Sequence, residues 1–272
     1  MADRAGAGPW PRLARLGIDA RVGAAGLARV AVMIALVAVA EGIFLAAGLI
    51  AGAMAELTAL AVLLTLAAVY RGRPDGTAAI ALSLLPLVRI LSIALPSVLV
   101  PTWLWHAEIG IPVIAGTALA ARLSGIAWSE LGLRRPPVIE TAIAAGAGLL
   151  FGLVAARIAN TSSLLPDRSI VTAVLASAAV VVGAALAEEL LFRGLLMRVA
   201  EEVVVGSGIV VATALSTLLY FATLNPRYII FSAAVSLLFA ILTRRSKSIG
   251  PALACHAMLV WSQLILWPGI LG

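Results

Sequence analysis

The apolar residues of this chain fall in long stretches with few polar interruptions. A helix needs about 20 predominantly apolar residues to cross the ~30 Å hydrocarbon core of a bilayer. The alternating segments of about ten residues that build a membrane β-barrel are absent from the sequence. We therefore predict an all-α, polytopic helical membrane protein with about eight or nine transmembrane helices. Nine stretches qualify as spans: Gly26–Ile50, Gly52–Tyr70, Thr77–Val100, Ala107–Leu123, Val138–Ala159, Ile170–Val199, Gly206–Leu224, Tyr228–Thr243 and Ser248–Trp267.

Composition supports a membrane protein. Hydrophobic residues make up 62% of the 272 positions and charged residues only 12%, whereas a soluble globular protein has about 25% charged residues. The net charge is +6, but the basic residues are scattered in small groups, which argues against a nucleic-acid partner. The single cysteine, Cys255, excludes an internal disulfide bond.

The basic residues mark one side of the predicted bundle. They gather before the first predicted span and after the second, fourth, sixth and eighth, which an alternating topology places on one face. Because positively charged loops stay in the cytoplasm, we expect an integral protein of the plasma (inner) membrane with a cytoplasmic N-terminus. A retained signal anchor is favoured over a cleaved signal peptide, since the apolar run continues past the candidate cleavage site "AVAEG".

Four segments follow from this pattern. Residues 1–25 form a cytoplasmic N-terminal segment, residues 26–123 the N-terminal transmembrane helices, and residues 138–272 a C-terminal group of five spans. Between them, residues 124–137, "SGIAWSELGLRRPP", are too polar to span. We predict that they form a short interfacial amphipathic helix closed by two prolines. The "GLLFG" stretch in the fifth span matches GxxxG, whose ordinary meaning is close helix packing.

Three charges interrupt the sixth span in the stretch "AEELLFRGLL", which runs from Ala187 to Leu196. Each charge at a helix centre costs ~2.5–3.5 kcal/mol on insertion scales. Glu189 and Arg193 are four residues apart and can pair on one helix face, which leaves Glu188 free of that pair. A free carboxylate in an apolar span is suited to act as a general base. The alternative is that all three charges lie near the cytoplasmic end and only reach toward the interface.

His256 is the second polar feature, eight residues into the last predicted span. At 1.5 Å per residue it lies ~12 Å from the cytoplasmic end, and Glu188 lies ~17 Å from the same side. Both are expected to line one cytoplasm-facing chamber, with Gln263 on the same face as His256. A histidine that only packs between helices is the alternative. The adjacent Cys255 is not expected to be a nucleophile beside His256, because neighbouring helix residues do not face each other.

Arg89 is another charge deep in a predicted span, the third. Glu41 and Glu56 lie in the first two spans and are its natural partners. We interpret the three residues as a structural charge cluster. Buried charges also occur on ion pathways, which keeps open a transporter or channel in which Glu188, Glu189 and Arg89 form the path. The two halves of the chain show no repeat of the kind that many transporters have.

At this point the residues resemble a known family. "EELLFRG" matches the EExxxR motif of the CAAX-processing and bacteriocin-processing (CPBP) intramembrane endopeptidases, relatives of the Ras-converting CAAX prenyl protease. "SIGPALACHA" resembles that family's last conserved helix, which carries a histidine, and "SELGLRRP" resembles the lead-in of prokaryotic members. The resemblance covers about Ser129 to Trp267 and makes residues 138–272 a CPBP-like protease core.

The resemblance implies a mechanism. Glu188 would activate a water that attacks a peptide carbonyl, Glu189 and Arg193 would hold the architecture, and His256 would orient the water or stabilise the oxyanion. A divalent metal such as zinc is a candidate cofactor, with Glu188 and His256 as candidate ligands, although a zinc site needs at least three protein ligands. The implied partners are membrane lipid and a hydrophobic or lipid-modified peptide or membrane-protein substrate.

The chain departs from the family pattern at two positions. The FxxxH motif aligns best with "FATLN", which puts Asn225 where the family has histidine. Val260 stands four residues after His256, where the family has asparagine or aspartate. Loss of one oxyanion donor can lower the rate ~10²–10³-fold. A catalytically impaired pseudoprotease that binds hydrophobic or lipidated peptides is therefore the alternative to an active endopeptidase.

Overall fold

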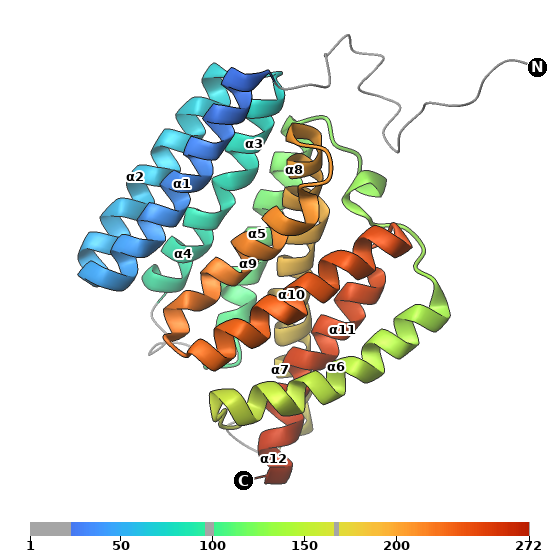
Figure 1. Ribbon diagram of the computed structural model, residues 1–272. Coiled ribbons are helices and arrows are strands. Elements are labelled where there is room, and N and C mark those ends of the chain that lie inside the picture. The colour runs from blue at the N-terminus through green and yellow to red at the C-terminus, as the bar shows by residue number, and fades with distance from the viewer. Residues whose placement is uncertain (1–22, 96–100, 166–168, 272) are drawn as a thin grey trace, which may run out of the picture.

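The computed structural model describes residues 23–95, 101–165 and 169–271, and within these ranges the chain forms helices and no strand (Figure 1). The all-α fold class is confirmed. The predicted N-terminal segment lies almost wholly outside the described residues, as does the end of the third predicted span. The long helices outside the sixth span are α1 (Ala24–Ala47), α2 (Leu49–Val69), α3 (Pro74–Leu82), α4 (Leu84–Ala94), α5 (Trp105–Leu123), α6 (Val138–Ala159), α9 (Gly208–Leu219), α10 (Pro226–Ser246) and α11 (Gly250–Trp261).

The sixth predicted span is the longest helix and changes type along its length. It comprises α7 (Ile170–Val180), the π-helix η3 (Val181–Leu186), the π-helix η4 (Glu189–Leu196) and α8 (Met197–Val203). Two further elements are irregular: the 3₁₀ turn η5 (Tyr220–Thr223) extends α9, and the π-helix η6 (Ser262–Leu266) joins α11 to α12 (Trp267–Leu271).

Seven helices of the described residues are long and apolar enough to cross a membrane, which confirms a polytopic membrane protein. They are Ala24–Ala47, Leu49–Val69, Pro74–Ala94, Val138–Ala159, Ile170–Val203, Pro226–Ser246 and Gly250–Ile270. The seventh predicted span forms the shorter apolar helix Gly208–Thr223. The fourth predicted span forms α5, which has Glu108 in its first turn and Arg122 in its last.

The first predicted span ends three residues earlier than expected. Gly48 has φ +83°, a left-handed conformation that ends α1 at Ala47, and α2 begins at the next residue. The two helices then pack closely, because a Cβ at Gly52 would lie 2.6 Å from Cα of Phe44. Gly48, which tolerates positive φ, therefore joins the two helices directly.

Residues 124–137 do not form the short helix predicted for them, while their interfacial position stays a prediction. The segment contains a single 3₁₀ turn, η2 (Trp128–Leu131), and Gly125 and Gly132 on either side have positive φ. Leu131 is buried in the main hydrophobic core, and the backbone oxygen of Gly132 accepts a hydrogen bond from the N–H of Ile249 at 3.0 Å. The segment is thus a strap that fixes the start of α11.

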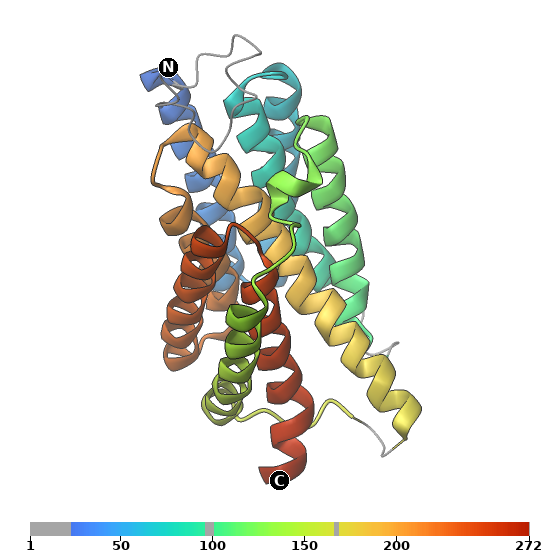
Figure 2. The same ribbon diagram turned by 90° about the vertical axis from the view of Figure 1, so that its right-hand side faces the viewer.

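The helices form two packed groups. One core joins α1–α5 with α8, α9 and η4, and a second joins α6, α10 and α11 (Figure 1). The Ile170–Val203 helix, yellow to orange in Figure 2, passes between α5 and α11 and connects the two groups. Its π-helical centre therefore lies where both groups meet.

Two glycine pairs explain how closely these helices approach. A Cβ at Gly148 or Gly152 of α6 would overlap the carbonyl oxygen of Cys255 or the hydroxyl of Ser262, so the "GLLFG" stretch packs directly on α11, as predicted. On the other side, a Cβ at Gly110 of α5 would overlap the backbone of Gly183 in η3. Small residues let backbones meet in this way and hold α11 and the central helix in place.

Candidate active site

The central helix departs from α-helical geometry on both sides of Glu188. The π-helical segments η3 and η4 flank Ala187 and Glu188, which alone keep α-helical hydrogen bonding between them. A π turn, with i→i+5 hydrogen bonds, is rare and is frequently found at functional sites. The hydrophobic pattern predicted one continuous span here and no change of helix type.

The predicted pair of Glu189 and Arg193 is present. Nη1 of Arg193 lies 3.1 Å from Oε1 of Glu189, and both side chains are almost completely buried. The other end of the guanidinium donates from Nη2 to the backbone oxygen of Ser236 at 3.1 Å and to its hydroxyl at 2.9 Å. The Ser236 hydroxyl is in turn hydrogen-bonded to that of Ser216 on α9. Arg193 thus ties the central helix to α10.

His256 joins this pair through one ring nitrogen. Its Nδ1 lies 2.9 Å from Oε1 of Glu189. An ionised carboxylate only accepts hydrogen bonds, so Nδ1 carries the proton of this contact. The opposite nitrogen, Nε2, then points away from Glu189 and lies 3.9 Å from Oε2 of Glu188. Phe239 packs against the imidazole with a ring-centre distance of 5.2 Å.

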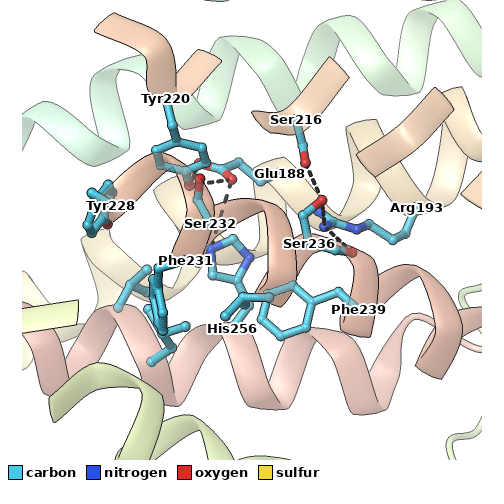
Figure 3. A pocket seen from close by; sticks show the side chains of 13 residues that line it. Glu188, Arg193, Ser216, Tyr220, Tyr228, Phe231, Ser232, Ser236, Phe239 and His256 are labelled. Atoms are coloured by element: carbon cyan, nitrogen blue, oxygen red, sulfur yellow. Dashed lines mark hydrogen bonds and ion pairs between the residues drawn. The ribbon is translucent and has the colours of Figure 1, made fainter. Parts of the chain in front are cut away.

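Glu188 and Glu189 are adjacent but have different environments. The Glu189 side chain is fully buried, whereas that of Glu188 is 29% exposed and faces a cavity. The Tyr220 hydroxyl donates to the Glu188 carboxylate, at 3.1 Å from Oε2 and 3.4 Å from Oε1. Figure 3 shows Glu188 between Tyr220 and His256 on the wall of this cavity.

The cavity is enclosed by the central helix, α9, α10 and α11 and combines polar and apolar walls. Its polar lining contains both groups of the Glu188–His256 pair and several hydroxyls, and its apolar lining is aromatic and branched. The lining residues are Glu188, Arg193, Ser216, Tyr220, Tyr228, Phe231, Ser232, Val235, Ser236, Phe239, His256, Leu259 and Val260. A bound chain would therefore meet the charged groups beside apolar surface.

Asn225 lies outside this cluster. Its Oδ1 accepts from the backbone N–H of Tyr228 at 3.2 Å and caps the start of α10, and its Nδ2 donates to the backbone oxygen of Ile158 at 3.1 Å. Both functional atoms of its amide are thus committed to the backbone. The motif alignment predicted a site residue here, but Pro226 directly after it starts a helix, and an N-cap is a preferred position for asparagine.

Three other residues considered in the sequence analysis lie either at the cavity or in the packing between helices. Val260 lines the cavity and offers no hydrogen bond. Gln263 lies beside the cavity, where Tyr228 and Thr161 are each within 3.4 Å of its amide. Cys255 is buried in the second core.

Tyr220 is the residue that motif reading missed. Tyr220 directly precedes the "FATLN" stretch, Phe221 to Asn225. The motif alignment selected the last residue of this stretch, whereas the side chain that reaches Glu188 belongs to the residue just before it. The hydrophobic pattern predicted a continuous helix through this region, but the 3₁₀ turn η5 begins at Tyr220. The aromatic ring of Tyr228 meets that of Tyr220 edge to face at 5.8 Å.

The side chains of the site do not fit a zinc centre. Zinc takes at least three protein ligands, and the described part of the chain contains no group of three His, Cys, Asp or Glu side chains that could hold a metal ion. Glu188 and His256 supply two donors. Oε1 of Glu189 is engaged by both Arg193 and His256.

The comparisons with known proteins agree with the motifs. Residues 170–262 match the family model described as Rce1-like, type II CAAX prenyl endopeptidase. No curated protein and no solved structure matches the chain. The matched segment runs from the start of α7 to the end of α11 and includes Glu188, Tyr220 and His256. Residues 170–262 are thus similar to the Rce1-like, type II CAAX prenyl endopeptidase family.

Proposed function

We propose that this protein is an intramembrane endopeptidase in which Glu188 activates a water for attack on a peptide bond. The observation that carries the proposal is the relation of two residues 68 positions apart. Glu188 and His256 face one cavity with Oε2 and Nε2 at 3.9 Å, while Glu189 holds the far nitrogen of the same imidazole. This geometry supports a role for the Glu188 carboxylate and the oriented imidazole of His256 at one reacting centre.

The net charge of the cluster formed by Glu188, Glu189, Arg193 and His256 depends on one proton. Two carboxylates and one guanidinium leave one net negative charge when His256 is neutral. One added proton makes the cluster neutral overall. This proton can bind either to the carboxylate of Glu188 or to Nε2 of His256. Glu189 stabilises the imidazolium form through Nδ1, in the way that a buried carboxylate supports a catalytic histidine. The arrangement therefore lets Glu188 accept a proton while His256 donates one.

The hydrolytic step uses these two protonation states. Glu188 takes a proton from water as the water oxygen bonds to the peptide carbonyl carbon. The carbonyl oxygen becomes an oxyanion and accepts from Nε2–H of His256. As Glu188 takes the proton of the water, the Tyr220 hydroxyl gives up its hydrogen bond to this carboxylate and donates to the oxyanion instead. When the C–N bond breaks, the proton on Glu188 passes to the leaving amine. Fixed donors are effective here because apolar side chains such as Phe239 and Leu259 exclude water.

Tyr220 takes the place of the donor that Val260 lacks. A valine four residues after His256 offers nothing to an oxyanion. The Tyr220 hydroxyl belongs to the lining of the same cavity, and its oxygen lies 3.1 Å from Oε2 of Glu188. This compensation favours an active enzyme over a protein that lost its chemistry.

The substrate that suits this cavity is a hydrophobic or lipid-modified peptide segment. Phe231, Val235, Leu259 and Val260 supply apolar contacts beside the polar groups. The exposed helix faces around the cavity are apolar as well, with residues such as Leu237 and Ile241 of α10 among them. A substrate that partitions into the bilayer would reach the site directly from the membrane.

A binding protein without hydrolytic activity is the second candidate. Val260 and the capping role of Asn225 favour it, because both positions lack the groups that the family motif implies there. Such a protein would hold the same hydrophobic or lipidated peptides in the same cavity.

Cleavage assays on purified protein in nanodiscs distinguish the two candidates. We would incubate a library of hydrophobic and prenylated peptides with the wild type, Glu188→Gln and His256→Ala, and detect new termini by mass spectrometry. Cleavage by the wild type that both substitutions abolish supports the endopeptidase. Binding of these peptides with no new terminus from the wild type supports the binding protein and rejects the proposed chemistry.

A further inference from the structure

Arg89 of α4 makes a contact beyond its expected partner. As predicted from the sequence, it pairs with Glu41: Nη2 lies 2.8 Å from Oε2, and Nε lies 3.1 Å from both carboxylate oxygens. The same Nη2 also donates to the backbone oxygen of Leu219 at 3.1 Å. One guanidinium thus joins the N-terminal helices to the end of α9.

This contact bears on the candidate active site because Leu219 directly precedes Tyr220. Leu219 is the last residue of α9, and Tyr220 begins the 3₁₀ turn η5. The carbonyl of Leu219 and the N–H of Tyr220 belong to one planar peptide unit. Arg89 therefore holds the peptide plane from which the Tyr220 side chain extends to Glu188. The last carbonyls of a helix lack partners within it, and a cation there is favourable.

The guanidinium is itself firmly held. The Arg89 side chain is 10% exposed and that of Glu41 is 1% exposed, and the guanidinium carbon lies 4.9 Å from the ring centre of Phe44. An arginine can serve the carboxylate and the carbonyl together because its donors form a planar fork, which a lysine ammonium lacks.

We propose that Arg89, held by Glu41, is a positioning residue that fixes Tyr220 against Glu188. The proposal rests on the function proposed above, in which Tyr220 supplies an oxyanion donor. It assigns the N-terminal helices, which lie outside the matched family segment, a part in building the site.

The test reads the position of Tyr220 directly. The chain has three tyrosines, Tyr70, Tyr220 and Tyr228, so protein labelled with 3-fluorotyrosine in nanodiscs has three ¹⁹F signals. Tyr→Phe variants assign them. In the wild-type background, Glu188→Gln shifts the Tyr220 signal, because the acceptor of its hydroxyl changes.

The decisive variant replaces both residues of the Arg89–Glu41 ion pair at once. Arg89→Met with Glu41→Leu leaves no unpaired charge from the pair, and a buried pair replaced by apolar residues is often tolerated. We expect that in this background Glu188→Gln no longer shifts the Tyr220 signal, while the Tyr70 signal stays at its wild-type position. Arg89→Lys keeps the charge pair without the fork. In this background too, Glu188→Gln is expected to leave the Tyr220 signal unshifted. Arg89→Lys therefore serves as the test variant if the double variant does not fold.

Glu56→Gln is the matched control. Glu56 is fully buried in α2, and among the described residues neither of its carboxylate oxygens has a hydrogen-bond partner. Its substitution removes a charge from the same helix group without touching Leu219. The Tyr220 signal is expected to keep its response to Glu188→Gln in this background.

Activity supplies the second readout. With a cleaved peptide in hand, Arg89→Lys is expected to lower kcat about tenfold with KM unchanged, the pattern for a lost transition-state contact. An unchanged response of the Tyr220 signal in both Arg89 variants would overturn the proposal, and so would unchanged kcat beside an uncoupled Tyr220. If the wild type cleaves no peptide, the endopeptidase proposal fails, but the ¹⁹F signals still decide whether Arg89 positions Tyr220.

Discussion

Nδ1 of His256 lies 2.9 Å from Oε1 of Glu189, and this contact separates the roles of two adjacent glutamates. Glu189 is fully buried and engaged with His256 and Arg193, so its charge is part of the structure. Glu188 keeps a partly exposed carboxylate toward the cavity. Substitution at the two positions should therefore affect different properties.

Glu189→Gln is expected to destabilise the protein, because it leaves the buried guanidinium of Arg193 without its counter-charge. Breaking a buried ion pair by removing one partner costs ~3–5 kcal/mol. Glu188→Gln should leave the free energy of unfolding nearly unchanged, since glutamine still accepts from the Tyr220 hydroxyl. Thermal unfolding of both variants in the same detergent measures the difference. Equal unfolding temperatures would show that Glu189 is not the structural member of the pair.

Glu188→Gln is expected to lower kcat for a cleaved peptide by ~10²–10⁴-fold, the usual contribution of a general base. Glutamine cannot take the proton of the attacking water. Glu140→Gln on α6, an exposed position away from the cavity, is the control and should keep wild-type kcat. Steady-state cleavage of one peptide compares the three proteins. Wild-type kcat in Glu188→Gln would assign the base to another residue.

Tyr220→Phe is expected to lower kcat by ~10²-fold with little change in KM, because it removes one oxyanion donor and no apolar contact. Tyr228→Phe is the matched control, since the Tyr228 hydroxyl contacts Gln263 instead of Glu188. The kcat and KM of both variants test this on the same peptide. A larger loss from Tyr228→Phe would move the missing donor to that residue.

The sequence predicted the fold class and the central charge cluster because both depend on simple rules. Long apolar stretches predict membrane helices, and a four-residue spacing predicts the Glu189–Arg193 pair. The pairing of Arg89 with Glu41 followed because a buried charge needs a partner. The approach of His256 to the glutamates followed from its depth in the last span.

The sequence could not predict features that depend on local backbone geometry. The π-helical turns on either side of Glu188 lie within a continuous apolar stretch, whose hydrophobic pattern does not distinguish a π turn from an α turn. The 3₁₀ turn begins at Tyr220, whose hydroxyl contacts Glu188. Asn225 caps α10 instead of contacting Glu188. Residues 124–137 do not form the predicted helix, because glycines with positive φ lie on either side of the turn Trp128–Leu131 and Leu131 is buried.

Chelation is expected to leave the activity unchanged. In the described portion of the chain no three side chains are grouped as zinc ligands, and the proposed mechanism has Glu188 activate the water without a bound metal. We would measure cleavage after extended dialysis against 1,10-phenanthroline, with total metal determined by mass spectrometry. Loss of activity that zinc restores would show a metal centre and reject this prediction.

Val260→Asn is expected to raise kcat at least tenfold, because it adds a hydrogen-bond donor to the cavity on the face of α11 that carries His256. Asn225→His, the other return to the family pattern, should give no gain. It removes the cap of α10 and the contact with the Ile158 oxygen, and loss of a helix cap costs ~0.5–2 kcal/mol. Parallel measurements of kcat and unfolding temperature separate the two variants. Higher kcat in Asn225→His would place position 225 in the active site, and no gain from Val260→Asn would show that Tyr220 already supplies the donor in full.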